Sequence, residues 1–276
     1  MLRPRALSAA VLVPSLLLAL VIGRWAILGV VTLAVVLAAR EMFGLLRSAG
    51  YPSLAWLGTV LAALLVVDAG LETVQEGSGL LLLGVGVALI AIGAFARPDP
   101  RDGLVAWTTT VFGALYVALL AFVVRLGLIA PDLPVGAPFA ALTAERGWVL
   151  LLVLGVWAYD TGAYLVGDRY GTVRFLTHIS ASKTYAGLVG GLAATTIVSG
   201  VMLYGLGQPP VMAVILGPIL GLAAQAGDLA ESMIKRAAGA KESGGLIPGH
   251  GGVLDRTDSF LFAAPAVTLF VVAFIR

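Results

Sequence analysis

The 276-residue chain is dominated by long apolar runs separated by short polar segments. Hydrophobic residues make up 60% of it and charged residues 12%, whereas soluble domains average roughly 45–50% and 25%. A helix needs about 20 mostly apolar residues to cross a bilayer, and in lipid only helices and closed barrels satisfy their own backbone hydrogen bonds. The runs are long enough for helices, so we predict an all-α, polytopic integral membrane bundle that forms one membrane domain over residues 1–276.

The apolar runs predict about nine transmembrane helices. Their expected ranges are 7–23, 25–46, 54–74, 79–96, 104–128, 147–166, 185–206, 210–228 and 258–275. The first run follows Arg3 and Arg5 as in a secretory signal, but it shows no clear small-residue cleavage site, so we expect a retained helix. We expect residues 1–130 to be an apolar scaffold and residues 147–276, which carry the polar clusters, to be the catalytic half.

The distribution of basic residues predicts the orientation. With nine spans and a cytoplasmic N-terminus, all but four of the 17 basic residues face the cytoplasm, the exceptions being Arg24, Arg125, Arg146 and Arg276. This bias follows the positive-inside rule. The most polar late loops, residues 167–184 and 229–257, then face the cytoplasm, where nucleotides are available. We therefore expect a multi-pass protein of the inner (plasma) membrane with its site on the cytoplasmic face.

The composition also limits the possible chemistry. The chain contains no cysteine, which excludes disulfides, zinc thiolates and cysteine nucleophiles. A metal site would have to use oxygen ligands or the two histidines, which favours a hard cation such as magnesium.

Asp160 and Glu41 are acidic residues that lie within apolar runs. Asp160 lies inside a predicted span, where a carboxylate costs about 2.5–3.5 kcal/mol on insertion scales. We expect it to face a polar cavity or a cation, with pairing to a neighbouring helix as the alternative. Glu41 follows Arg40 near a predicted helix end, where a basic side chain can snorkel. We interpret Glu41 as a helix-end residue, with a place in the site as the alternative.

A second polar cluster, Ser180, Ser182, Lys183 and Thr184, immediately precedes an apolar helix. Hydroxyl groups and free backbone N–H groups at a helix N-terminus favour anions, and a nearby lysine adds a charge for phosphate. Helix capping alone is the alternative, because serine and threonine are common caps.

The third cluster surrounds a glycine-rich loop. Asp228 and Glu231 share one helix face, and Asp255 and Asp258 repeat the same spacing at the start of the last span. A glycine-rich loop lets backbone amides approach phosphates closely. Two acidic helix ends joined by a basic loop suit magnesium and a polyphosphate. The alternative is an interfacial loop whose charges are merely solvated.

Residues 232–258, which we call the signature segment, resemble the signature of the phosphatidate cytidylyltransferases (CDP-diacylglycerol synthases). The spacing agrees throughout, and Glu242 stands where the family has aspartate. The matching residues are Ser232, Lys235, Arg236, Lys241, Pro248, His250, Gly251, Gly252, Asp255, Arg256 and Asp258.

Two upstream elements are also similar to this family. The family's intramembrane Asp followed by Ala-Tyr matches Asp160, Ala163 and Tyr164. The family's Ser-Pro-Lys-Lys-Thr-Trp-Glu-Gly element matches residues 180–187 only in part. Four positions differ, namely Ala181 for Pro, Ser182 for the first Lys, Tyr185 for Trp and Ala186 for Glu. Lys183 would therefore carry the remaining anion contact.

The resemblance implies a magnesium-dependent reaction of CTP with phosphatidate that gives CDP-diacylglycerol and pyrophosphate, by a homodimer surrounded by membrane lipids and without nucleic acid. Asp228 and Asp255 are the expected ligands of one or two magnesium ions, with Asp160, Glu231 and Asp258 as further candidates. The expected catalytic residues are Asp228, Asp255, Lys183, Lys235 and Arg236. The expected substrate-binding residues are Ser180, Ser182, Thr184, Lys241, His250, Gly251, Gly252 and Arg256.

Other functions remain open at this point. A CTP-dependent polyprenol or lipid kinase, or a cytidylyltransferase for another lipid phosphate, would also place a nucleotide site at the membrane. A transporter with intramembrane carboxylates is a different class, although the charge is concentrated on one side and no inverted repeat is visible. An inactive homologue is the third alternative, because residues 180–187 depart from the family pattern.

Overall fold

The computed structural model describes residues 14–15, 17–71, 77–247, 249 and 251–276. The chain divides into two compact units. Unit 1 comprises Met1–Val124 and Met233–Thr257, and unit 2 comprises Arg125–Ser232 and Asp258–Arg276. Most of the signature segment therefore belongs to the same unit as the apolar N-terminal scaffold. The single membrane domain expected from the sequence stays a prediction.

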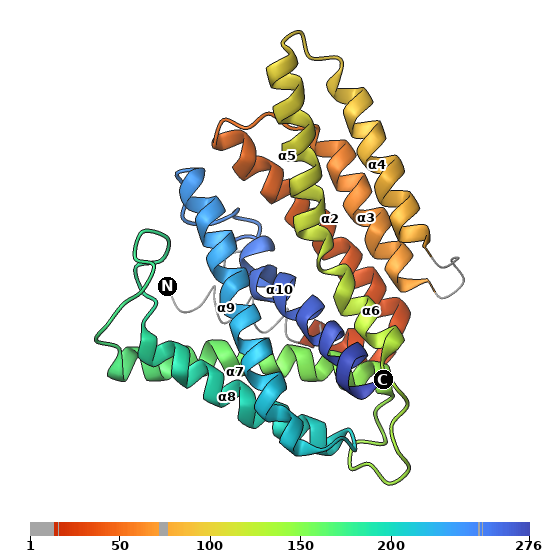
Figure 1. Cartoon of the computed structure of the whole chain (residues 1–276), viewed down its shortest axis with the longest axis vertical. Coiled ribbons are helices and arrows are strands. Elements are labelled where there is room, and N and C mark those ends of the chain that lie inside the picture. Colours follow the sequence, from red (N-terminus) through yellow and green to blue (C-terminus); the bar gives the residue numbers. More distant parts are fainter. Residues whose placement is uncertain (1–13, 16, 72–76, 248, 250) are drawn as a thin grey trace. The chain divides into compact units, whose positions relative to one another are not determined.

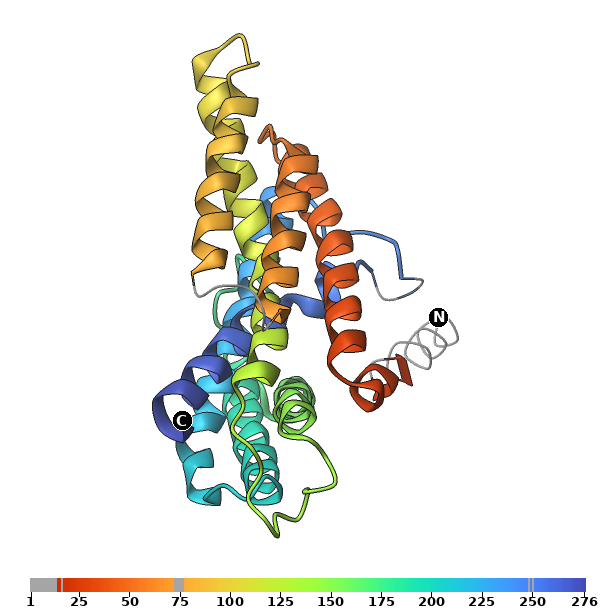
Figure 2. The ribbon, with the colours of Figure 1, turned by 90° about the vertical axis from the view of Figure 1, so that its right-hand side faces the viewer.

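The scaffold of unit 1 consists of four helices that pack on one another (Figures 1 and 2). They are α2 (Arg24–Ser48), α3 (Ala55–Gly70), α4 (Ser78–Ala94) and α5 (Pro100–Ala118). Phe43 of α2 is 1% exposed, and a side chain added at Gly58 of α3 or Gly113 of α5 would collide with its ring. The small residues of α3 and α5 thus let the three helices close around one aromatic side chain, as is typical of membrane helix packing.

Unit 2 contains the long helices of the second half. They are α7 (Ala144–Tyr170), α8 (Tyr185–Gly205) and most of α9 (Ala213–Ala237) and α10 (Leu254–Phe270), with η1 (Pro210–Met212) before α9 and a π-helical turn, η2 (Val271–Ile275), at the end. α7 and α8 pack along each other (Figure 1). An added Cβ at Gly162 of α7 would lie 2.7 Å from the Gly190 carbonyl of α8, so the two backbones are in close contact.

The described residues confirm a multi-pass helical membrane protein. Five helical segments are long and apolar enough to cross a bilayer: α2, α7, α8, η1 with α9, and α10 with η2. A sixth is formed if α5 and α6 (Ala121–Ile129), which meet at a 42° bend, count as one span. α3 and α4 are apolar but shorter than 18 residues. The predicted count of nine is not confirmed, and most of the predicted span 7–23 lies outside the described residues.

Several helix boundaries differ from the predicted ranges; α9, for example, ends at Ala237 rather than at residue 228. The predicted span 104–128 is interrupted between α5 and α6, where Leu119 and Leu120 donate to carbonyls three residues back. Neither Pro nor Gly lies at this break, so no residue there predicts it. The predicted span 147–166 is part of a longer helix, α7, which runs from Ala144 to Tyr170. The chain turns at Gly171, where an added Cβ would collide with Gly167 and Thr184.

Candidate active site

The loop between α9 and α10 is folded back on itself. α9 ends at Ala237, and Gly239 follows with φ 66°, a conformation that favours glycine. The Ala240 N–H donates to the Lys235 carbonyl at 2.8 Å, which closes the end of the helix. Farther along, the Ile247 N–H donates to the Gly251 carbonyl at 2.9 Å. The predicted helix break at the glycines is therefore confirmed, whereas Pro248 and His250 lie outside the described residues.

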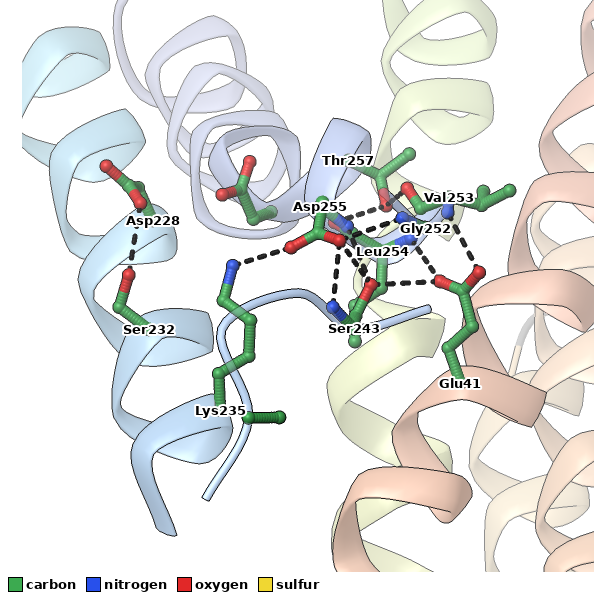
Figure 3. Close-up of polar contacts among 12 residues, drawn as sticks. Glu41, Asp228, Ser232, Lys235, Ser243, Gly252, Val253, Leu254, Asp255 and Thr257 are labelled. Carbon is green, nitrogen blue, oxygen red and sulfur yellow. Dashed lines mark hydrogen bonds and ion pairs between the residues drawn. The ribbon is translucent and has the colours of Figure 1, made fainter. Parts of the chain in front are cut away.

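Asp255 is the centre of the polar contacts in unit 1 (Figure 3). Its Oδ1 accepts from the Lys235 ammonium at 2.6 Å, and this pair is nearly buried, with side-chain exposures of 12% for Lys235 and 6% for Asp255. Its Oδ2 accepts from the backbone N–H groups of Ser243 and Gly252, both at 2.8 Å, and lies 2.9 Å from the Ser243 hydroxyl. Charge-assisted bonds of this kind are about twice as strong as neutral ones, so Asp255 ties α9, the loop and α10 together.

Glu41 of α2 binds the same loop from the scaffold side (Figure 3). Its two carboxylate oxygens accept from the backbone N–H groups of Val253 and Leu254, at 3.0 and 2.8 Å. The Ser243 hydroxyl lies 3.1 Å from Glu41 Oε2. The Ser243 hydroxyl has one proton and can donate it in a hydrogen bond to either Glu41 or Asp255. The interpretation of Glu41 as a helix-end residue is therefore incomplete, because its carboxylate caps the start of α10.

In unit 2, Lys183 forms an ion pair with Asp228. Both side chains are about three-quarters buried, with exposures of 23% and 24%. The Ser232 hydroxyl, one turn along α9, lies 3.4 Å from Asp228 Oδ1. The sequence predicted both Lys183 and Asp228 as site residues, and the structure brings them into contact.

The position of Lys183 is set by how the chain enters α8. Thr184 is the N-cap, and its hydroxyl accepts from the Gly187 N–H at 3.1 Å. The Phe175 N–H donates to the Lys183 carbonyl at 3.2 Å, and the Tyr185 N–H donates to the Val173 carbonyl at 3.1 Å. The loop from Gly171 to Thr184 is thus folded back on its own start. Thr184 caps the helix, and its predicted substrate contact stays a prediction.

α9 is held against α7 and α10 just before Asp228. The buried Tyr159 hydroxyl of α7 donates to Gln225 Oε1 at 2.7 Å. A side chain added at Gly227 would collide with the Asp258 carbonyl of α10. Asp228 therefore lies beside two fixed helix contacts. Gln225 and Gly227 were not predicted as site residues, although both come shortly before Asp228 and Glu231 in the sequence.

The other predicted residues are placed as follows. Glu231 is fully buried on α9, and Asp160 follows Tyr159 on α7. Asp258 lies in the second turn of α10 and accepts from the Ser259 N–H at 2.7 Å. Gly251 and Gly252 are buried in the loop, and Ser180 and Ser182 lie in the loop before α8. The basic side chains of Arg236, Lys241 and Arg256 are exposed.

Asp228 and Asp255, the two expected magnesium ligands, differ in how well they could hold the ion. Among the described residues there is no group of three or more His, Asp or Glu arranged as a metal site, but magnesium usually takes only one or two carboxylates and completes its shell with water and phosphate. Asp228 is partly exposed and can offer such an oxygen. Asp255 is enclosed by four donors, so a cation would have to replace Lys235 at Oδ1. The oxygen donors fit magnesium, and Asp228 fits it better.

Comparison with known proteins gives the family. A model of the cytidylyltransferase family matches residues 3–274. A phosphatidate cytidylyltransferase of Synechocystis sp. is 32% identical over 287 aligned positions, which cover 97% of this chain and 96% of that protein. The chloroplastic phosphatidate cytidylyltransferase 5 of Arabidopsis thaliana is 34% identical over 90% of this chain and 66% of its own length. A phosphatidate cytidylyltransferase of Staphylococcus aureus strain COL is 42% identical over 50% of this chain and 55% of its own. This chain therefore belongs to the cytidylyltransferase family.

Proposed function

We propose that this protein transfers the cytidylyl group of CTP to phosphatidate, giving CDP-diacylglycerol and pyrophosphate in phospholipid biosynthesis. The observation that carries the proposal is the direct contact among Lys235, Gly252 and Asp255, three residues of the signature segment that converge on one carboxylate. Family membership over residues 3–274 and relatives that are named for this activity support it.

The reaction needs little covalent chemistry from the protein. A phosphatidate oxygen attacks the α-phosphorus of CTP and forms a new P–O bond, while the bond from the α-phosphorus to the α,β-bridging oxygen breaks and pyrophosphate leaves with the electron pair. A phosphomonoester is already a nucleophile, so no strong general base is required. Catalysis is then mainly positioning and neutralisation of charge.

The basic residues have the roles of holding the phosphates. We assign Lys183, Lys235 and Arg236 to the reacting phosphates, and Lys241 and Arg256 to the remaining anionic oxygens. Lys183 and Lys235 each form an ion pair with an aspartate. The pairing restricts the motion of the lysine side chain before substrate binds, which lowers the entropic cost of orienting it. Backbone and hydroxyl donors for substrate would come from Ser180, Ser182, Thr184, His250, Gly251 and Gly252.

Magnesium is part of the proposal, with one or two ions. Asp228 would hold the metal, with Asp255 as a second ligand if it releases Lys235, and Asp160, Glu231 and Asp258 as further candidates. A bound magnesium ion would withdraw charge from phosphate oxygens and favour departure of pyrophosphate. The protein's own part is to orient Lys183 and Lys235 and to fix the start of α10.

The finer arrangement in the membrane is also proposed. Nine spans with a cytoplasmic N-terminus would place the loops 167–184 and 229–257 on the cytoplasmic face of the inner membrane. That side would expose the basic residues of both loops to CTP, and a lipid phosphate would reach the same depth from the cytoplasmic leaflet. A homodimer is the expected assembly.

The test is a turnover assay with protein purified in detergent, supplied with CTP and phosphatidate in the presence and absence of magnesium. We expect CDP-diacylglycerol and pyrophosphate in equal amounts, and no product without the divalent cation. Asp228→Asn should abolish most turnover, whereas Asp132→Asn, in an exposed loop, should not. Formation of CDP with a phosphorylated lipid would instead identify a lipid kinase, and inactivity with phosphatidate but turnover with another lipid phosphate would change the substrate.

A further inference from the structure

One acidic side chain of the apolar scaffold contacts the signature segment directly. Glu41 lies on α2, separated from the segment by about 200 residues of sequence, and yet three of its contacts are with Ser243, Val253 and Leu254. All four residues belong to unit 1. We propose that Glu41 is a positioning residue of the cytidylyl transfer, which fixes the start of α10 and with it Asp255; this inference rests on the function proposed above.

The geometry shows what Glu41 holds. The first N–H groups of a helix have no partner within the helix, and at the start of α10 the Val253 and Leu254 N–H groups point at the two oxygens of Glu41, at 3.0 and 2.8 Å. A negative charge at this end of a helix is favoured by the helix dipole. The next residue along the helix is Asp255, so any shift of Val253 and Leu254 moves its carboxylate.

Ser243 connects the two carboxylates. Its hydroxyl lies 3.1 Å from Glu41 Oε2 and 2.9 Å from Asp255 Oδ2, and its own N–H donates to Asp255. The Ser243 hydroxyl also accepts a hydrogen bond from the Asp255 N–H at 3.3 Å. Glu41 therefore acts on Asp255 by two routes, through the backbone of α10 and through Ser243, and the Asp255 carboxylate in turn holds Lys235.

Two glycines make room for Glu41. A Cβ added at Gly252 would collide with Glu41 Oε2 and the Ser243 hydroxyl, and one added at Gly244 would lie 2.8 Å from Glu41 Oε1 and 3.0 Å from its Cδ. Gly252 is a position of the signature segment. The presence of glycine there has a physical reason in this chain, since a larger residue would displace the carboxylate that caps α10.

The test compares Glu41→Gln, Glu41→Asp and Glu41→Ala with Asp68→Asn. Asp68 is a matched control because it is also a half-buried carboxylate of the scaffold, and its hydroxyl partner, Ser78 at 2.6 Å, belongs to the scaffold as well. We expect Glu41→Gln to lower kcat by about 10–100-fold, as for loss of groups that orient a catalytic residue, with KM for CTP within a few-fold. Asp68→Asn should keep kcat near that of the unaltered protein at a comparable melting temperature.

Two further measurements separate positioning from general stability. Hydrogen exchange at Val253 and Leu254 should accelerate in Glu41→Gln but not in Asp68→Asn, and this readout does not depend on which reaction the enzyme performs. Glu41→Asp, which keeps the charge, should recover part of kcat. Gly244→Ala should reduce kcat by itself, and its effect should be less than additive when combined with Glu41→Gln because both act through one carboxylate.

Several outcomes would overturn the role of Glu41. One is an unchanged kcat in Glu41→Ala, and another is unchanged exchange at Val253 and Leu254. A loss of kcat in Glu41→Gln that Asp68→Asn reproduces, at the same fall in melting temperature, would also do so. If the unaltered protein makes no CDP-diacylglycerol, the proposed function fails, whereas the exchange comparison still decides whether Glu41 fixes the start of α10.

Discussion

Lys183, at the entry to α8, forms an ion pair with Asp228 of α9. The two residues are 45 positions apart in sequence and come from two different polar clusters. Their contact joins the element at residues 180–187, which matches the family pattern only in part, to the part of α9 just before the signature segment. An expected anion-binding group and an expected metal ligand are thus direct neighbours, so each sets the electrostatic environment of the other.

This pair predicts strongly coupled mutations. Asp228→Asn and Lys183→Met should each lower kcat/KM for CTP, Asp228→Asn by on the order of 100-fold or more because an orienting charge is lost at the reacting phosphates. The double variant should be less impaired than the product of the two, with a coupling of about 0.5–3 kcal/mol, as for residues in contact. Steady-state kinetics at saturating magnesium measures both the loss of kcat/KM in each single variant and the coupling energy. Unaltered Michaelis constants in Lys183→Met would remove its anion-binding role.

Asp255→Asn tests the centre of the contacts in unit 1. The amide keeps one acceptor oxygen, but the substitution removes the charge that pairs with the nearly buried Lys235, so turnover should fall by on the order of 100-fold. Titration with magnesium shows whether the loss includes metal binding. Near-normal turnover of Asp255→Asn at saturating magnesium would show that Asp255 is not a required ligand, and Asp132→Asn serves as the charge-matched control.

The contact of α9 with α10 predicts a cost in stability at Gly227. Gly227→Ala would place a methyl group against the Asp258 carbonyl, and overpacking of this kind costs about 1–3 kcal/mol. Thermal unfolding in detergent should therefore begin at a lower temperature, and turnover should fall because Asp228 is the next residue. Gly29→Ala, where nothing lies within 4 Å of an added Cβ, is the control and should keep the melting temperature. Equal melting temperatures for the two variants would contradict the close packing.

The proposed orientation in the membrane can be tested by labelling single introduced cysteines. The chain has no native cysteine that would add background labelling. Gly245→Cys lies in the exposed loop of the signature segment, and Val135→Cys lies in the exposed loop before α7. A membrane-impermeant maleimide should label Gly245→Cys only in inside-out vesicles and Val135→Cys only in right-side-out vesicles. Labelling of both positions from the same side would exclude the proposed topology.

Much of the fold could be predicted from hydropathy. Apolar runs must form helices in lipid because every backbone N–H and C=O group needs a partner within the chain. Each predicted span from the second to the ninth overlaps one α-helix, except the span 104–128, which overlaps both α5 and α6. The end of α9 before Gly239 was also predictable, since glycine breaks a helix locally. The interruption between α5 and α6 was not, because neither Pro nor Gly lies there to oppose a helix.

For the candidate site, the sequence alone determined the chemical groups, and the tertiary structure decided their partners. Spacing placed Asp228 with Glu231 and Asp255 with Asp258, because residues three apart on a helix share a face, and the resemblance to the family signature added Lys235. Glu41 could be noticed only as a carboxylate in an apolar run, and Ser243 carried no signal. Their contacts join segments about 200 residues apart, and such pairings depend on how helices pack around small residues such as Gly252. Hydropathy and helix-breaking residues along the chain determine the helices and their polar ends, but only the packed chain determines which carboxylate accepts from which backbone N–H group.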